Sequence, residues 1–190
     1  MIFYRLLKDD VRTANRTDSN TFEDVPADMW CNTAISTIAR LGIVKGRSTT
    51  EFDPDAPITR AEFATICARF DQSDVESSGT FADIGDCWAK AYIERAAALG
   101  WAKGYSDGTF RPNNHITRAE AMCIINRVLG RLPETSGDLL PGMKTWPDNP
   151  ESAWYYFHVQ EATNSHTFER KADGVHETWK TLLETALGNR

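Results

Sequence analysis

Residues 58–70 read ITRAEFATICARF and residues 116–128 read ITRAEAMCIINRV, so one five-residue opening occurs twice, 58 positions apart. Thr59 can cap a helix through its hydroxyl, and Glu62 can reach back to the Thr59 amide. Thr117 and Glu120 can do the same in the second copy. Apolar residues follow at helical spacing in both copies. The two stretches therefore predict two helices with well-marked starts.

The arginine inside each opening is not needed for capping. Arg60 and Arg118 fall in the first turn, where the helix dipole slightly disfavours a cation. A guanidinium beside unpaired helix-start amides makes a good anion site. The alternative is a solvated arginine, or one paired with a nearby aspartate. Recurrence in two copies favours a repeated ligand site.

Composition limits the function classes. The chain has 190 residues, 41% of them hydrophobic and 25% charged, as in an ordinary globular protein of one domain or two small ones. Its net charge of −6 argues against nucleic acid as a partner. No apolar run is long enough for membrane insertion. Residues 1–12 do not read as a signal peptide, so we expect any export signal to lie outside this sequence.

The four cysteines are spaced too widely for a zinc ribbon or a CxxC redox site. Cysteine is also a common small core residue. We expect free, largely buried thiols at all four positions: Cys31, Cys67, Cys87 and Cys123.

The rest of the chain repeats around these helices. Units at 22–72 and 81–131 share, in order, Phe-x-Asp, a Trp, a predicted helix, a Lys-Gly loop, Phe-x-Pro and Ile-Thr-Arg-Ala-Glu. The first helix of the first unit is predicted from Ala27 or Met29 to Leu41, and a polar connector at 71–80. Residues 1–14 resemble the last helix of a further, truncated repeat.

A divergent unit occupies 144–190. It starts like the others with Trp146-Pro-Asp but lacks Phe-x-Pro and Thr-Arg-Ala-Glu. A last helix is predicted at 175–187 with three inward residues, Trp179, Leu182 and Leu183. Units of this size cannot bury their apolar faces alone, so they must pack together. The sequence predicts a compact, mainly α body with pseudo-symmetric helices.

These ordered elements, present twice, resemble the S-layer homology (SLH) domain over nearly all of 22–129. The resemblance implies tandem two-helix repeats in a pseudo-threefold helical assembly. It also implies an extracellular, cell-surface anchoring module that binds secondary cell-wall polysaccharide, often through a pyruvylated amino sugar.

The resemblance also implies a set of ligand-binding residues in grooves between repeats. The ketal carboxylate is assigned to Arg60 and Arg118, and close backbone approach to Gly46 and Gly104. Groove walls are assigned to Trp30, Trp88, Asp24 and Asp83, and sugar stacking to Tyr105. The alternatives are that both tryptophans are core residues and that both aspartates cap a helix or pair with arginine.

No catalytic, cofactor or metal site is predicted. The four histidines (His115, His158, His166 and His176) show no HExxH motif and no acidic partner at ligand spacing. Asp53 and Asp107 lie in stretches that lack the remaining calcium ligands of an EF-hand. A second functional hypothesis is a structural assembly module that associates with other chains without binding sugar, for instance by self-association through the incomplete N-terminal repeat.

Overall fold

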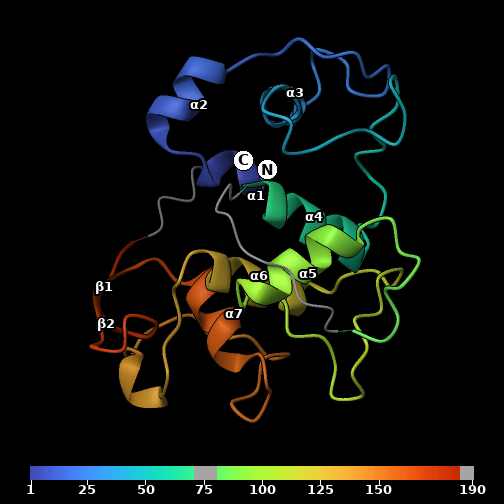
Figure 1. Cartoon of the computed structure of the whole chain (residues 1–190). Coiled ribbons are helices and arrows are strands. Elements are labelled where there is room, and N and C mark those ends of the chain that lie inside the picture. The colour runs from blue at the N-terminus through green and yellow to red at the C-terminus, as the bar shows by residue number, and fades with distance from the viewer. Residues whose placement is uncertain (71–80, 185–190) are drawn as a thin grey trace.

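The computed structural model of the chain describes residues 1–70 and 81–184 (Figure 1). The predicted connector at 71–80 and the end of the predicted C-terminal helix lie outside this part. The elements are helices α1 (Ile2–Leu6), α2 (Asp9–Asn15), α3 (Asn32–Arg40), α4 (Arg60–Phe70), α5 (Lys90–Ala98), α6 (Arg118–Val128) and α7 (Tyr156–Thr163), the 3-10 helix η1 (Ser136–Asp138), and strands β1 (His166–Arg170) and β2 (Glu177–Leu182). The mainly helical class is confirmed.

Three helices from different units share one hydrophobic cluster. Phe3 comes from α1, Phe63 and Cys67 from α4, and Ile124 and Ile125 from α6. Each of these helices also packs against the first helix of the following unit, as α1 with α3, α4 with α5 and α6 with α7 (Figure 1). No unit therefore buries its apolar faces alone, as the repeat pattern requires.

Helix boundaries differ from the predictions at two places. The N-terminal helix is interrupted because Leu7 and Lys8 adopt extended backbone, with ψ of 138° and 146°. Helix α3 begins at Asn32, later than predicted. Before it, the Asn32 side chain donates from Nδ2 to the Val25 carbonyl over 3.1 Å and helps to hold residues 26–31 in turns.

The predicted C-terminal helix is wrong. Strands β1 and β2 form an antiparallel hairpin instead, with Phe168 opposite Trp179. Glu177 and Trp179 are buried while Lys180 is exposed, which is the two-residue period of a strand. Trp179 does point inward and stacks on His166 with ring centroids 4.0 Å apart. Leu183 is exposed.

All four cysteines are free, as predicted. Three are buried in the helical core and Cys87 is half-buried.

Candidate binding grooves between the repeats

Both predicted capping boxes are present. The Thr59 amide donates to Glu62 Oε2 over 2.7 Å, and the Glu62 amide donates to Thr59 Oγ1 over 3.2 Å. The Thr117 amide donates to Glu120 Oε2 over 2.9 Å, and the Glu120 amide donates to Thr117 Oγ1 over 3.2 Å. The two copies of the motif are therefore locally alike.

Arg60 lies between the two repeats and is only 5% exposed. Its Nη1 is 2.7 Å from Glu120 Oε1, and its Nε donates to the Phe110 carbonyl over 2.8 Å. Its guanidinium also lies 4.7 Å from the ring centroids of Tyr105 and Phe110. We call this set of Arg60, Tyr105, Phe110 and Glu120 the filled junction. Here the structure shows the ion-paired alternative, with a glutamate as the partner.

The first amides of α4 are also engaged by the second repeat. The Arg60 amide donates to the Asn114 carbonyl over 2.8 Å, and the Ala61 amide to the Pro112 carbonyl over 3.0 Å. In return, the Ile116 amide donates to the Ile58 carbonyl over 3.0 Å. The donors that an anion would need at this helix start are therefore already used.

Arg118, at the equivalent position of the second repeat, is exposed. Within residues 1–70 and 81–184 its side chain has no hydrogen-bond or ion-pair partner, and neither do the amides of Arg118 and Ala119. The start of α6 thus keeps the free donors that the start of α4 has lost.

Tyr105 belongs to the filled junction. Its hydroxyl donates to Glu120 Oε1 over 2.6 Å, and its ring lies beneath the guanidinium of Arg111 at 4.1 Å. A sugar ring could stack on this face of Tyr105 only by displacing Arg111.

Gly46 and Gly104 are required by contacts within their own repeats. A Cβ on Gly46 would lie 2.5 Å from the Phe22 ring, and one on Gly104 would lie 2.3 Å from the Phe81 ring. Distances this short are not tolerated without movement of the ring. Each glycine is therefore needed for packing within its own unit, and its predicted approach to a ligand stays a prediction.

Asp24 and Asp83 hold the loops before α4 and α6. Asp24 accepts hydrogen bonds from the Phe52 and Asp53 amides over 2.9 Å and 2.6 Å. Asp83 accepts the equivalent pair from Phe110 and Arg111, both over 2.7 Å. These bonds secure positive φ angles at Asp53 (61°) and Arg111 (58°). The Phe52 bond is the main reason why the pKa of Asp24 is lowered. Among the described residues, neither carboxylate caps a helix or pairs with an arginine side chain.

An open groove of about 500 Å³ lies beside the loop of the first repeat. Its walls include Gly46 and Arg47 from the loop, Glu62 and Arg69 from α4, and Trp88 from the second repeat. Trp88 is 64% exposed and the equivalent Trp30 is 72% exposed, so neither is a core residue. Trp30 does not line this groove.

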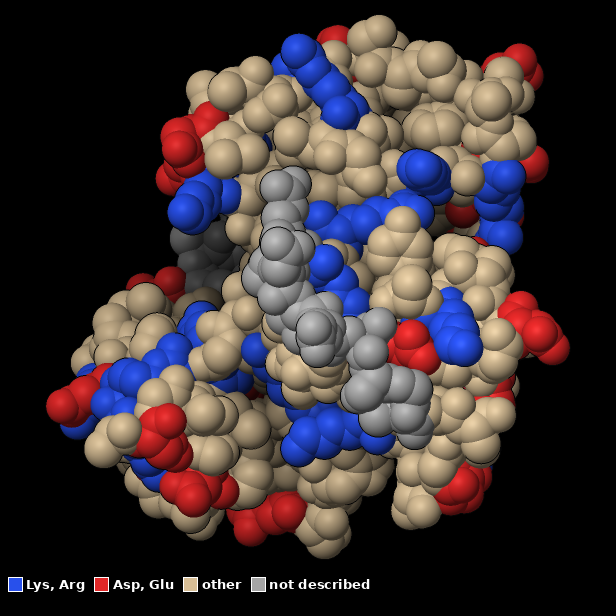
Figure 2. All heavy atoms as spheres, viewed as in Figure 1, with Lys and Arg blue, Asp and Glu red and all other residues tan. Residues whose placement is uncertain are grey.

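The charged groups along the groove form two sets. Arg47 Nε lies 2.9 Å from Asp53 Oδ2, and Arg47 Nη1 is 3.9 Å from Glu62 Oε1. Arg69 lies 4.9 Å from the Tyr92 ring centroid, and its hydrogen bond lowers the pKa of Tyr92, with a smaller contribution from Lys45. Figure 2 shows Lys and Arg side chains gathered along the hollowed band below the part of the molecule that holds α3.

Sequence reasoning did not select Lys45, Arg47 or Arg69 as site residues. The signal for Arg69 was present, because Arg5, Arg69 and Arg127 recur at the same place in three helices.

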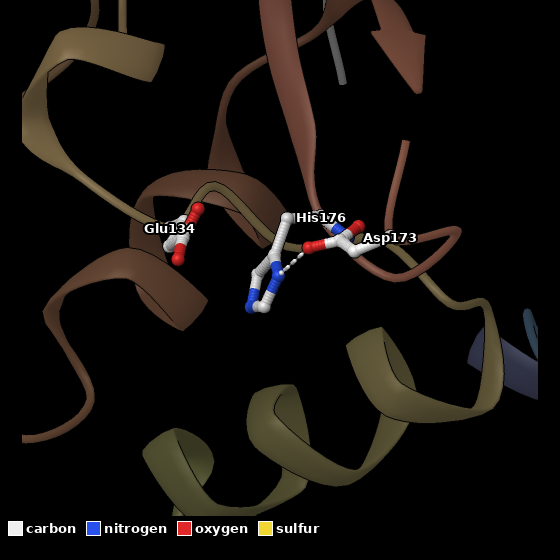
Figure 3. A group of neighbouring side chains, drawn as sticks. All are labelled: Glu134, Asp173 and His176. Atoms are coloured by element: carbon white, nitrogen blue, oxygen red, sulfur yellow. Dashed lines mark hydrogen bonds and ion pairs between the residues drawn. The ribbon is translucent and has the colours of Figure 1, made fainter. Parts of the chain in front are cut away.

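Two other clusters contain groups able to bind a metal. Glu134, Asp173 and His176 lie together near the surface (Figure 3), where Lys171 Nζ donates to Glu134 over 3.0 Å. Asp173 Oδ2 is 2.7 Å from His176 Nδ1. These contacts, between largely exposed groups, are those of an ordinary surface ion-pair network.

The second cluster is the buried set of Glu161, His166 and Glu177. Arg131 Nη2 lies 2.9 Å from His166 Nε2, 2.8 Å from Glu161 Oε1 and 3.6 Å from Glu177 Oε1. Burial opposes charge on His166, but its hydrogen bonds to the two glutamates outweigh burial and raise its pKa. His166 Nε2 also lies 3.2 Å from Glu161 Oε2 and 3.1 Å from Glu177 Oε1, so these contacts join the hairpin to α7.

Within the described residues, no helix is both long enough and apolar enough to cross a membrane. The sequence profile of the S-layer homology domain matches residues 21–64 and 80–122. These ranges contain both capping boxes, both glycine loops and both exposed tryptophans, Trp30 and Trp88.

Similar proteins share these repeats. The chain is 35% identical over 182 residues to a cellulosome-anchoring protein of Acetivibrio thermocellus, covering 92% of this chain and 39% of that protein. It is 34% identical over 122 residues to a surface-layer 125 kDa protein of Lysinibacillus sphaericus, covering 60% of this chain and 10% of that one. It is 34% identical over 138 residues to an amylopullulanase of Thermoanaerobacterium thermosulfurigenes, covering 70% of this chain and 7% of that enzyme. The chain thus spans less than half the length of these relatives, and it belongs to the S-layer homology domain family.

Proposed function

We propose that this chain is a non-catalytic module of the cell surface that attaches to the cell wall by binding an acidic polysaccharide. The relatives named for anchoring and for the surface layer support the location and the attachment role. The segment shared with the amylopullulanase is 7% of that enzyme, which fits an attached module better than a catalytic unit.

The observation that carries the proposal is the open groove beside Gly46. Its lining includes three cations, Lys45, Arg47 and Arg69, and two carboxylates, Asp53 and Glu62, in a chain whose net charge is −6. A locally positive groove favours an anionic ligand. The exposed indole of Trp88 offers a flat apolar surface for one face of a sugar ring.

A pyruvylated amino sugar of a secondary cell-wall polysaccharide fits this chemistry. Its ketal carboxylate would pair with Arg69 and Lys45, which are not held by carboxylates of the groove. Arg118, exposed and free at the start of α6, is a second candidate for an acidic group. Arg60 is proposed to act indirectly, by holding the two repeats in register.

The shared cluster of α1, α4 and α6 also supports a pseudo-threefold arrangement of the three helix pairs as part of the proposal. In that arrangement the groove wall at Trp88 would recur at Trp154, which is likewise exposed at the start of its helix.

The test compares Trp88→Ala with Trp30→Ala in a pull-down on purified cell walls. Both tryptophans are exposed at equivalent positions, but only Trp88 lines the groove. Losing an aromatic stacking surface should weaken wall binding about tenfold for Trp88→Ala and leave Trp30→Ala unchanged. Equal binding by both variants and the unmodified chain would refute the groove.

A second experiment tests whether the ketal pyruvate is the group that the groove binds. Walls from which the ketal pyruvate has been removed should bind the unmodified chain poorly, and Arg69→Ala should reduce binding to intact walls. Retained binding to depyruvylated walls would reject the pyruvate-specific form of the proposal while leaving the groove itself in place.

A further inference from the structure

The filled junction shows which hydrogen bonds join one repeat to the next. Three backbone hydrogen bonds join the start of α4 to residues 112–116, from the amides of Arg60, Ala61 and Ile116. Two side-chain bonds add to them, from Arg60 to the Phe110 carbonyl and to Glu120 Oε1. One partner supplies an arginine-led helix start, and the other supplies a row of carbonyls that ends in a carboxylate.

The same row exists in the first repeat but is vacant. The counterparts of the accepting carbonyls of Phe110, Pro112 and Asn114 are those of Phe52, Pro54 and Ala56, and all three residues line the open groove. Within the described part of the chain these carbonyls accept no hydrogen bond, and the Ile58 amide donates none. We call this row, together with Glu62, the vacant edge.

Glu120 in the filled junction and Glu62 at the vacant edge also differ in their hydrogen bonding. Glu120 Oε1 accepts from Arg60 over 2.7 Å and from Tyr105 over 2.6 Å. Of the described residues, only Arg47 lies near Glu62 Oε1, at 3.9 Å, which is beyond hydrogen-bond distance. Arg47, Asp53 and Glu62 together carry a charge of −1, so one further cation would neutralise this end of the groove.

The matching donor is also present and free. Arg118 occupies the position of Arg60 in the same Ile-Thr-Arg-Ala-Glu motif. The amides of Arg118 and Ala119 correspond to those two amides at the start of α4 that donate hydrogen bonds to the second repeat. The chain therefore contains one completed junction, one set of unused acceptors at the vacant edge and one set of unused donors at the Arg118 helix start. The unused groups correspond in sequence to those of the completed junction.

We propose that the vacant edge binds the Arg118 helix start of a second copy of this chain. Arg118 of one molecule bonds the Phe52 carbonyl and Glu62 of the next, and the amides of Arg118 and Ala119 bond the carbonyls of Ala56 and Pro54. Because the two halves lie on different surfaces, the contact is head-to-tail, and repetition produces chains of molecules or closed rings.

The proposal does not rest on glycan binding, and its test contains no glycan. Sedimentation velocity of the purified chain over a wide concentration range should show a mass that rises with concentration. Arg118→Ala and Glu62→Gln should each weaken association at least tenfold, because each removes a charge-assisted hydrogen bond. Glutamine still supports a capping box at position 62. Arg40→Ala and Glu151→Gln, exposed substitutions away from both halves, serve as controls and should associate normally.

Mixing the two variants separates a lost contact from a damaged fold. Arg118→Ala retains the vacant edge and Glu62→Gln retains the free arginine, so the mixture should form a one-to-one heterodimer and nothing larger. An unmodified chain that stays monomeric at every concentration would overturn the proposal. So would association of Arg118→Ala that equals that of the unmodified chain, or a mixture that remains monomeric while the unmodified chain associates.

Discussion

The starts of α4 and α6 have the same sequence and opposite surroundings. Arg60 is 5% exposed and held by Glu120 and the Phe110 carbonyl, whereas Arg118 is exposed and has no partner among residues 1–70 and 81–184. The capping boxes beneath them have the same bonds. The difference comes from the neighbouring unit, because a second loop packs against α4 and the divergent third unit offers no such loop to α6. A repeated motif therefore fixes local structure, while its neighbour decides whether its arginine is structural or available.

The strongest test of this comparison is to remove each arginine in turn. Arg60→Ala leaves a poorly exposed carboxylate at Glu120 and a carbonyl at Phe110 without their partner, and should lower the free energy of unfolding by about 4 kcal/mol. Arg118→Ala removes nothing from the folded chain and should change it by less than about 0.5 kcal/mol. Urea denaturation followed by tryptophan fluorescence measures both. Equal effects would mean that the Arg60–Glu120 pair is not a net stabilising contact.

A second test concerns the two glycine loops. Gly104→Ala places a methyl group against the Phe81 ring and also at a φ of 62°. Gly46→Ala has no positive φ but places a methyl group against the Glu51 carbonyl oxygen and the Phe22 ring. We expect losses of about 3 kcal/mol and about 2 kcal/mol respectively, from overpacking and the cost of a left-handed backbone. Gly100→Ala is the control, because its φ is 74° but no atom lies within 4 Å. It should cost about 1 kcal/mol. Thermal or urea unfolding should show this order, and a Gly46→Ala variant as stable as the unmodified chain would contradict it.

The sequence was sufficient for those parts of the fold that are specified locally. The Thr-x-x-Glu pairs marked the starts of α4 and α6 through bonds made within four residues. The terminal hairpin could not be found in the same way. Residues 175–187 carry apolar side chains compatible with a helix, and the strand is stabilised by distant groups, including Glu161, which accepts from the Trp179 indole over 2.9 Å.

The site was predictable only in part, for the same reason. Trp30 and Trp88 were predicted as groove walls, with a core position as the alternative, and both side chains are exposed. Only three-dimensional packing places Trp88 in the same groove as Arg69. Asp24 and Asp83 were singled out by recurrence, yet their role as acceptors for amides 27 to 29 positions away leaves no local signature. The burial of Arg60 depends on a loop 50 residues further along the chain.

A third test extends the comparison to the helix pairs. In α4 and α5 an arginine, Arg69, meets Tyr92, and in α6 and α7 the equivalent Arg127 faces His158. Burial, helped by Arg127 and Lys103 and opposed by Glu161, lowers the pKa of His158 to about 4. The packing of α7 on α6 therefore requires a neutral imidazole, whereas the corresponding position on α5 holds Tyr92.

The sign of the pH effect follows from the lowered pKa. In the unfolded chain a histidine is protonated below about pH 6.5. In the folded chain His158 is not protonated until about pH 4, so between these pH values the unfolded state binds one more proton. This contribution to stability is complete above pH 6.5 and is lost progressively as the pH falls towards 4. Between pH 7 and pH 4.5 the unmodified chain should lose about 2 kcal/mol more than His158→Gln, as measured by urea denaturation at the two pH values. Because His158→Gln removes the group that distinguishes the two helix pairs, an unchanged pH dependence in this variant would place the acid sensitivity elsewhere. The next candidate would be Glu161, whose lowered pKa gives a pH effect of the same sign.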